Sequence, residues 1–385
     1  MNNFLSKFIF SIKKPKIIIV VGDGRSCTTE AIFQVLNQEN IVRKIVNFEQ
    51  FSLNFDKDEI LIFETKLDKP SDLEQFAFLI QKSSLAVLVI TQVGDIPSDK
   101  DFFAGEKEKT ASIRKLAKNL NPSSHLVLNF DDETVREIKD ETNLKEITFG
   151  FQEGADFRAS DIKINPVRES EEIERLKSDN FSNGVNGGTN FKVNYNGNIV
   201  PIWLDKLFGK EQIYSALAAS VVGIIFDLNL VEISQSLKNY HSLSGKMHTI
   251  KGIKNSLILD DSESATISSM IEAIEILGKL QGFKRKIAVL GDVIGAGKYA
   301  IEAHETIGEK VAKNTDLLFT FGSRAKFISQ GAQQKGMLVE KIFQFDTIDE
   351  GKLKLQEEIK EGDLILVDGS KEMKMGLIIE EIKGI

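Results

Sequence analysis

The chain has 385 residues, enough for two or three domains that each bury a core, and its 42% hydrophobic and 28% charged residues exclude wholesale disorder. A net charge of −8 argues against a nucleic-acid surface as the main function. One cysteine and four scattered histidines exclude an intramolecular disulfide and a Cys/His metal cluster, so we expect a reducing, cytoplasmic location.

Residues 1–13 have the pattern of an amphipathic helix. The apolar residues at helical spacing and the lysines around them are Phe4, Leu5, Phe8, Ile9, Ile12, Lys7, Lys13 and Lys14. The segment is too short to span a bilayer and has no small-residue cleavage site. Two interpretations remain open. The favoured one is a helix that packs on the first domain, and the other is a weak membrane-surface contact through residues 1–14.

The next segment has the shape of a phosphate-binding loop. A β-branched run over 17–21 predicts a buried strand, and a helical pattern begins at Thr28. Between them lie Gly22, Asp23, Gly24, Arg25, Ser26 and Cys27. Such a loop normally supplies a lysine and a hydroxyl for phosphate and Mg²⁺, but here Arg25 and Ser26 stand in a loop one residue shorter. On the loop alone, an ordinary strand-turn-helix is the favoured alternative.

Strands and helices then alternate, which predicts a parallel sheet with right-handed crossovers. Strands are expected near 59–64, 85–93 and 125–129, and helices over 71–82 and from about residue 105. Ligands of such sheets bind at the carboxyl ends of the strands. The residues expected along that rim are 22–26, Glu64, 94–99 and 129–132.

Residues 146–204 form short alternating runs between Gly- and Asn-rich turns, which predict an antiparallel addition to the sheet. Two helical runs follow, and the pattern resets near residue 243 into a second α/β unit. We therefore expect three parts. They are an N-terminal helix over 1–13, a central domain over 14–243 and a C-terminal domain over 244–385.

An ordered series of motifs runs from about residue 14 to the C-terminus. It comprises VLNFDDETV, ITFGFQEGADFRASDI, FGKEQIYSALAASVVG, LSGKMHTI, LILDDS, KIAVLGDV, GKYAIEAHETIG, LLFTFGSRA and LILVDGSKEMKM. In this order the motifs resemble the Mur ligases, closest to the MurF type that adds a dipeptide to the peptidoglycan precursor. The resemblance implies a P-loop-type parallel-sheet central domain with an antiparallel addition and a Rossmann-like C-terminal domain.

The resemblance also implies ATP-dependent amide formation with Mg²⁺. The γ-phosphate passes to a carboxylate, and an amine attacks the acyl phosphate. The positions that match nucleotide-binding residues of the family are Gly22, Gly24, Arg25, Ser26, Cys27, Asn129, Asp132, Asp260 and Asp261. The positions that match the family's metal site are Ser26, Glu64 and Lys109, and Lys109 is the candidate for the lysine that is carbamylated in relatives. The candidate catalytic residues are Lys109 and Lys246.

Several positions depart from the family pattern. Pro97 and Glu211 replace histidines, Lys246 replaces an arginine, and Asp368 replaces a basic residue. The Tyr-Asn-Ala-Asn-Pro stretch after the Asp260-Asp261 pair is lost, and Lys371 and Lys374 replace arginines. We also expect no uridine-nucleotide-binding domain before residue 14 and a shortened loop between Leu36 and Glu59.

Two functional hypotheses follow. The first is a divergent ATP-dependent amide ligase acting on small-molecule carboxylate and amine substrates. The second is a catalytically impaired homologue, a pseudoenzyme with a degenerate P-loop that binds or scaffolds cell-wall enzymes. Neither hypothesis involves nucleic acid.

Overall fold

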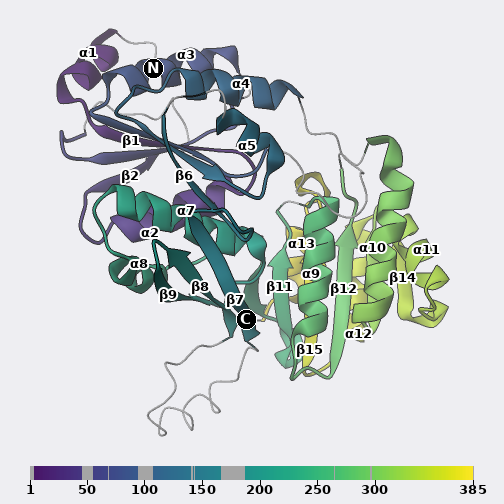
Figure 1. Cartoon of the computed structure of the whole chain (residues 1–385). Coiled ribbons are helices and arrows are strands. Elements are labelled where there is room, and N and C mark those ends of the chain that lie inside the picture. Colours follow the sequence, from purple (N-terminus) through teal and green to yellow (C-terminus); the bar gives the residue numbers. More distant parts are fainter. Residues whose placement is uncertain are drawn as a thin grey trace, which may run out of the picture.

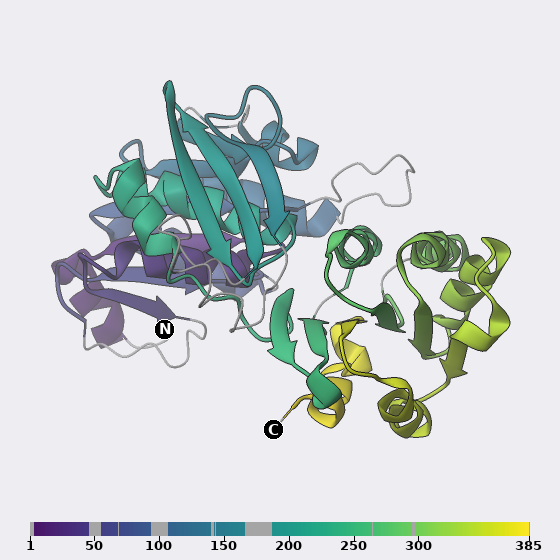
Figure 2. The same ribbon diagram turned by 90° about the horizontal axis from the view of Figure 1, so that it is seen from below.

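The computed structural model describes residues 4–45, 55–67, 69–93, 107–139, 142, 144–165, 187–263, 265–294 and 297–384. Within these residues the chain builds two sheets with helices packed on both faces of each (Figure 1). The larger sheet uses residues up to Asp205, and the smaller one begins at His248. Figure 2 shows the two units lying side by side.

The larger sheet has nine strands in the order β2-β3-β1-β4-β5-β6-β7-β8-β9. Their bounds are β1 (Lys16–Val21), β2 (Val42–Ile45), β3 (Ile60–Glu64), β4 (Leu85–Ile90), β5 (His125–Asn129), β6 (Lys145–Gly150), β7 (Phe157–Asn165), β8 (Gly188–Tyr195) and β9 (Asn198–Asp205). Strands β2 to β7 pair in parallel, and β8 and β9 add on antiparallel. The antiparallel addition therefore extends one edge of a parallel sheet.

Both faces of this sheet are buried, which explains the continuous apolar run in β1. Ile18 and Val20 pack on one face, and Ile17 and Ile19 pack on the other. The first face is covered by α2 (Arg25–Leu36), α7 (Lys210–Ile225) and α8 (Leu230–Leu237). The second is covered by α1 (Phe4–Lys13), α3 (Pro70–Lys82), α4 (Lys107–Lys118) and α5 (Glu133–Lys139). Figure 1 shows this three-layer arrangement.

The smaller sheet has six strands in the order β10-β11-β15-β12-β13-β14. Their bounds are β10 (His248–Lys251), β11 (Leu257–Asp261), β12 (Arg285–Gly291), β13 (Leu317–Phe321), β14 (Ile342–Phe345) and β15 (Asp363–Asp368). The helices on one face are α9 (Ile267–Lys279), α10 (Ala300–Asn314) and α11 (Lys326–Gln334). Those on the other are α12 (Ile348–Glu358) and α13 (Gly376–Ile382). Only β10 runs antiparallel to its neighbour.

The α/β fold class predicted from the sequence is confirmed, with two local differences. Residues 146–151 were expected in the antiparallel addition, but β6 lies in the parallel part of the sheet, beside β5. The helix expected from Thr28 begins at Arg25, three residues earlier. The boundary at residue 243 falls between α8 and β10, and we keep it as a proposal.

Helix α1 packs on the larger unit, as the favoured interpretation expects. The Phe10 side chain is fully buried, and its ring centroid lies 5.8 Å from that of Phe55 and 6.4 Å from that of Phe78. In the part of the chain that the structure describes, every helix is too short or too polar to traverse a lipid bilayer.

Candidate functional site

The loop after β1 is fixed to the end of the neighbouring strand β4. The Asp23 N–H donates to the Gln92 carbonyl at 2.7 Å, and the Thr91 hydroxyl donates to the Val21 carbonyl at 2.9 Å. Gly22 has a φ of +102°, and a Cβ at this position would lie 2.6 Å from the Gln92 carbonyl oxygen. Only glycine fits here, so the close approach of the two backbones holds the loop in place.

The three polar side chains predicted to serve this loop come together at the carboxyl ends of β1 and β3. Gly24, with φ of +74°, is the N-cap of α2. The Ser26 hydroxyl donates to Glu64 Oε1 at 2.5 Å, and Arg25 Nε lies 3.5 Å from the same oxygen. Arg25 Nη1 also donates to the Gly22 carbonyl at 3.0 Å. The arginine thus folds back onto the loop and onto Glu64.

Ser26 and Glu64 supply the donor chemistry that Mg²⁺ requires. A hydroxyl oxygen and a carboxylate oxygen are hard ligands, and Mg²⁺ beside phosphates commonly takes only one or two protein ligands with water in the other positions. Among the described residues no cluster of three His, Cys, Asp or Glu side chains could hold a metal alone. A metal here would therefore need phosphate oxygens as well. Lys109 lies in α4, but its side chain is outside the described part, so its metal role stays a prediction.

The carboxylate of Glu211 lies directly against this loop. Glu211 is in the first turn of α7, and a Cβ built on Gly24 would be 3.2 Å from Glu211 Cγ and 3.7 Å from Oε1. From the smaller unit, Lys246 Nζ approaches Glu211 Oε1 to 3.6 Å. This distance makes an ion pair and is too long for a hydrogen bond, and Oε1 has no hydrogen-bond partner among the described residues. A negative charge thus occupies the space beside the N-terminus of α2.

The charges of this group influence one another because most of them are buried. Burial by itself lowers the pKa of Lys246, but Glu211, Cys27 and Asp261 outweigh it, and the pKa is raised. The Cys27 thiol is fully buried, and burial together with Glu211 raises its pKa well above its ordinary value. Lys246 therefore stays protonated, and Cys27 stays a neutral thiol that packs under the loop.

The neighbouring residue, Gln212, connects α7 to the segment that leads into the smaller sheet. Its amide oxygen accepts from the Tyr240 hydroxyl at 2.6 Å. Its amide nitrogen donates to the Ser242 hydroxyl at 3.0 Å and to the Lys246 carbonyl at 3.1 Å. Because Gln212 is only 1% exposed, these bonds are protected from water.

In the smaller unit, two aspartates lie opposite each other at the carboxyl ends of adjacent parallel strands. Asp261 at the end of β11 is paired in register with Asp368 at the end of β15. Asp368 is fully buried, and neither of its carboxylate oxygens has a hydrogen-bond partner among the described residues. Asp260 is used differently, since it accepts from the Gly245 N–H at 2.9 Å and the Ser262 hydroxyl at 2.6 Å.

Burial governs the titration of this acidic pair. It raises the pKa of Asp368 to about 8, although the charge of Lys246 lowers it. Burial and then the charge of Asp368 raise the pKa of Asp261 well above its ordinary value. The pair therefore retains at least one proton at neutral pH, because two uncompensated charges cannot share so dry a site.

The rim residues from β5 organise the surrounding loops. Asp132 accepts from the Val93 N–H at 2.7 Å and from the Val135 N–H at 3.1 Å, and Asn129 accepts from the Asp131 N–H at 3.0 Å. These bonds fix the rim beside the predicted nucleotide site. The predicted nucleotide contacts of Asn129 and Asp132 themselves stay predictions.

The sequence analysis missed a network centred on Asp131. This buried carboxylate accepts N–H donors from Phe151 at 2.7 Å and Gln152 at 3.0 Å. It also accepts the hydroxyl of Tyr214 from α7 at 2.8 Å. The consecutive acids of the NFDDE segment were the only available signal, and they do not reveal which acid faces inward.

Of the remaining departures, Pro97 lies outside the described residues, and the two C-terminal lysines are near the surface. Lys371 Nζ is 3.2 Å from Glu263, and its side chain is 77% exposed. Lys374 has φ of +54° in the turn before α13. Their role in nucleotide binding stays a prediction.

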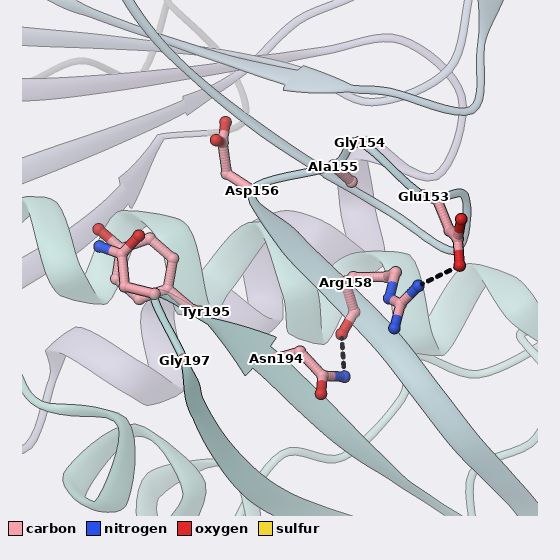
Figure 3. Close-up of a pocket in the computed structure, with 9 residues that line it drawn as sticks. Glu153, Gly154, Ala155, Asp156, Arg158, Asn194, Tyr195 and Gly197 are labelled. Carbon is pink, nitrogen blue, oxygen red and sulfur yellow. Dashed lines mark hydrogen bonds and ion pairs between the residues drawn. The ribbon is translucent and has the colours of Figure 1, made fainter.

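A pocket of about 320 Å³ lies apart from this site, between the turn after β6 and the β8–β9 hairpin (Figure 3). Its polar contacts include Arg158 Nη1 to Glu153 at 3.3 Å and Asn194 Nδ2 to the Arg158 carbonyl at 3.1 Å. None of the candidate site residues from the sequence analysis lines it, although Glu153 and Arg158 belong to the ITFGFQEGADFRASDI motif.

Comparison with known proteins identifies two family domains in the chain. The Mur ligase middle domain matches residues 22–223, and the Mur ligase, glutamate ligase domain matches residues 245–371. The UDP-N-acetylmuramoyl-tripeptide–D-alanyl-D-alanine ligase of Bacillus subtilis is 26% identical over 177 residues, which are 46% of this chain and 38% of that protein. The alignment therefore spans well under half of this relative's length.

Solved structures show the same fold. MurF from Acinetobacter baumannii superposes with a TM-score of 0.75 at 17% identity, covering 98% of this chain and 79% of that one. MurF ligase from Thermotoga maritima, in complex with ADP, gives a TM-score of 0.73 at 19% identity, covering 98% and 81%. At these identities the likeness establishes the arrangement of the elements.

Proposed function

This chain belongs to the Mur ligase family, and we propose that it is an ATP-dependent amide ligase acting in the synthesis of the peptidoglycan precursor. The observation that carries the proposal is the contact of the Ser26 hydroxyl with Glu64 at 2.5 Å, with Arg25 beside it at the N-terminus of α2. A hydroxyl, a carboxylate and a cation at the end of a parallel strand are the groups that a phosphate-binding loop requires.

In the proposed reaction, a carboxylate oxygen attacks the γ-phosphorus of ATP and ADP leaves. An amine then attacks the acyl carbon, loses a proton and displaces inorganic phosphate, which leaves an amide. The protein's task is mostly positioning and charge neutralisation. Bound Mg²⁺ would neutralise phosphate charge, and Ser26 and Glu64 are the residues that would hold it.

Two cations of this chain can neutralise the remaining charge. Arg25 is held within the loop by its bond to the Gly22 carbonyl, so its guanidinium is already oriented at the helix N-terminus. Lys246 approaches the same loop from the smaller unit, and its raised pKa keeps it protonated. The name of the B. subtilis relative supports a peptide carboxylate and the amine of a dipeptide as the substrate classes.

A second function, a catalytically impaired homologue that binds or scaffolds cell-wall enzymes, is favoured by Glu211. Its carboxylate lies against Gly24 and forms an ion pair with Lys246. A negative charge at this position repels the negatively charged phosphates of a nucleotide. In this alternative the two units are held together by the chain's own ion pair.

Calorimetric titration of Mg-ATP into the purified protein decides between the two. The ligase proposal expects saturable heat that is lost in Arg25→Ala. Arg114→Ala is the matched control, because Arg114 makes a comparable ion pair with Glu137 at 2.7 Å on the outer helices α4 and α5. No heat at millimolar nucleotide would refute the ligase proposal and leave the impaired homologue.

A further inference from the structure

The side-chain amide of Gln212 has only one orientation that satisfies its neighbours. A backbone carbonyl can only accept a hydrogen bond, so the amide nitrogen must face the Lys246 carbonyl, to which it donates at 3.1 Å. The amide oxygen then faces Tyr240, whose hydroxyl donates to it at 2.6 Å. The nitrogen also donates to Ser242 Oγ at 3.0 Å, and the Ser242 hydroxyl in turn donates to the Lys246 carbonyl at 2.7 Å. Two donors therefore converge on the Lys246 carbonyl.

The bond from Gln212 ties the backbone of Lys246 to the larger unit. Gln212 belongs to α7, which packs against α2 in the core of the larger unit. On the other side, the Gly245 N–H donates to Asp260 at 2.9 Å, which fixes the chain next to Lys246 to the smaller unit. The backbone that carries the Lys246 side chain is thus held from both units.

Other contacts join the two units without a bond to Lys246. The Lys210 N–H at the start of α7 donates to Glu272 of α9 at 2.7 Å, and the Phe208 side chain is fully buried in the core of the smaller unit. Loss of the Gln212 bond would therefore leave the two units together and change the position of Lys246 locally.

The position of the Lys246 ammonium depends on this backbone anchor because its ion pair with Glu211 is weakly directional. The ammonium lies 3.6 Å from Glu211 Oε1, which is too long for a hydrogen bond, and the Glu211 side chain is 39% exposed. A lysine carries its charge on a flexible four-carbon stem, so the ion pair by itself leaves the ammonium many positions. A fixed backbone limits these positions to the neighbourhood of the loop after β1.

We propose that Gln212 is a positioning residue, which places the Lys246 ammonium beside the N-terminus of α2 by holding the Lys246 backbone. Gln212 is only 1% exposed, so it acts through Lys246 and does not itself meet a ligand. The proposal rests on the proposed function for its purpose, because Lys246 is one of the two cations that would neutralise phosphate charge there. The placement itself exists without nucleotide and is measured without it.

The titration of Lys246, followed by NMR on the chain labelled at lysine Cε, tests this placement. Burial lowers the pKa of Lys246, but Glu211 and the other acids around it raise the pKa above its ordinary value. Gln212→Met keeps the length of the side chain and removes both of its bonds to the segment around Lys246. The ammonium should then move away from Glu211, and the midpoint should fall by at least about half a pH unit, or about threefold in proton affinity.

Two further variants accompany this measurement. Gln356→Met is the matched control, because the Gln356 amide donates to the Glu381 carbonyl at 2.9 Å and to its carboxylate at 2.8 Å, within the smaller unit. It should leave the midpoint of Lys246 unchanged. Ser242→Ala removes one of the two donors to the Lys246 carbonyl from a half-buried position, and it should lower the midpoint by less than Gln212→Met does. Should Gln212→Met fail to fold, Ser242→Ala decides the question.

A double-mutant cycle with Mg-ATP separates positioning from general support of the fold. We expect Gln212→Met to weaken Mg-ATP binding by about fivefold in the wild-type background. In the Lys246→Met background it should weaken binding by less than about twofold, because no ammonium is left to position. A residue that only supports the fold would weaken binding equally in both backgrounds.

Two results would overturn the proposal. One is an unchanged Lys246 midpoint in folded Gln212→Met and in Ser242→Ala. The other is an equal loss of Mg-ATP affinity with and without Lys246. A wild-type chain that gives no heat with Mg-ATP would instead refute the ligase proposal, and the midpoint of Lys246 would still decide whether Gln212 positions it.

Discussion

Replacing Glu211 by glutamine tests how far this side chain opposes nucleotide binding. The substitution keeps the shape of the side chain against Gly24 but removes its charge, and it leaves Lys246 without the carboxylate 3.6 Å from its ammonium. If phosphates bind at the N-terminus of α2, Glu211→Gln should bind Mg-ATP more tightly than the wild type. Both the lost repulsion and the released Lys246 act in this direction.

The size of the effect follows from distance and exposure. Two unit charges 4 Å apart interact by about 4 kcal/mol at an effective dielectric constant of 20 and by about 1 kcal/mol in water. The Glu211 side chain is 39% exposed, so solvent screens it and the lower half of this range applies. We expect a gain of about 1–2 kcal/mol, or about five- to thirtyfold in Kd.

Calorimetry with Mg-ATP at constant ionic strength measures this gain. Glu275→Gln is the matched control, because Glu275 is also 39% exposed and forms an ion pair with Lys310 at 2.7 Å, on the smaller unit. An affinity of Glu211→Gln within twofold of the wild type, or an equal gain in Glu275→Gln, would refute the reasoning. The first outcome would mean that phosphates do not approach Glu211, and the second that only net charge matters.

Three further predictions concern pH, stability and metal. Burial raises the pKa of Asp368 from 3.8 to about 8, so the folded state keeps a proton that the unfolded state releases, and stability falls as pH rises between about 4 and 8. Urea titrations at several pH values measure how the free energy of unfolding depends on pH. Asp368→Asn should make this dependence shallower by up to about 1.4 kcal/mol per pH unit, and an unchanged pH dependence would show that Asp368 does not cause it. Tyr214→Phe, which deletes the 2.8 Å bond to Asp131, should lower the free energy of unfolding by about 1–3 kcal/mol in the same assay, where equal stability would count against it. Ser26→Ala removes the hydroxyl that contacts Glu64. Adding Mg²⁺ should then increase the affinity for ATP less in this variant than in the wild type, and an equal increase would show that Ser26 does not bind the metal.

The sequence predicted most of the parallel sheet because its strands are buried on both faces. The run from Ile17 to Val21 has no polar interruption, and it became β1 within one residue of the expected start. The pattern failed in β6, whose alternating run was assigned to the antiparallel addition although the strand pairs in parallel with β5. Thr148 is 4% exposed, and its hydroxyl donates to Asp156 at 2.7 Å. A polar side chain that finds a local partner is not distinguishable from an exposed one by periodicity.

The sequence indicated which residues lie at the candidate site, but it did not indicate all of the contacts between them. Arg25, Ser26 and Glu64 come together because the carboxyl ends of neighbouring parallel strands meet, which the order of the elements already implies. The pairing of Glu211 with Lys246 crosses from one unit to the other and depends on how the two pack. Each replacement was visible separately in the sequence. Their mutual neutralisation is a property of the folded chain.

Two consecutive residues of α7, Glu211 and Gln212, contact Lys246 at its side chain and at its backbone. Its carbonyl accepts from the Gln212 amide inside a dry network, and its ammonium pairs with Glu211 at a partly exposed position. High salt screens the second attachment and hardly affects the first. High salt or a competing anion should therefore weaken the ionic contact between the two units and leave the Gln212 bond intact. The Lys210 N–H, which donates to Glu272 at 2.7 Å, and the buried Phe208 side chain would continue to join the units.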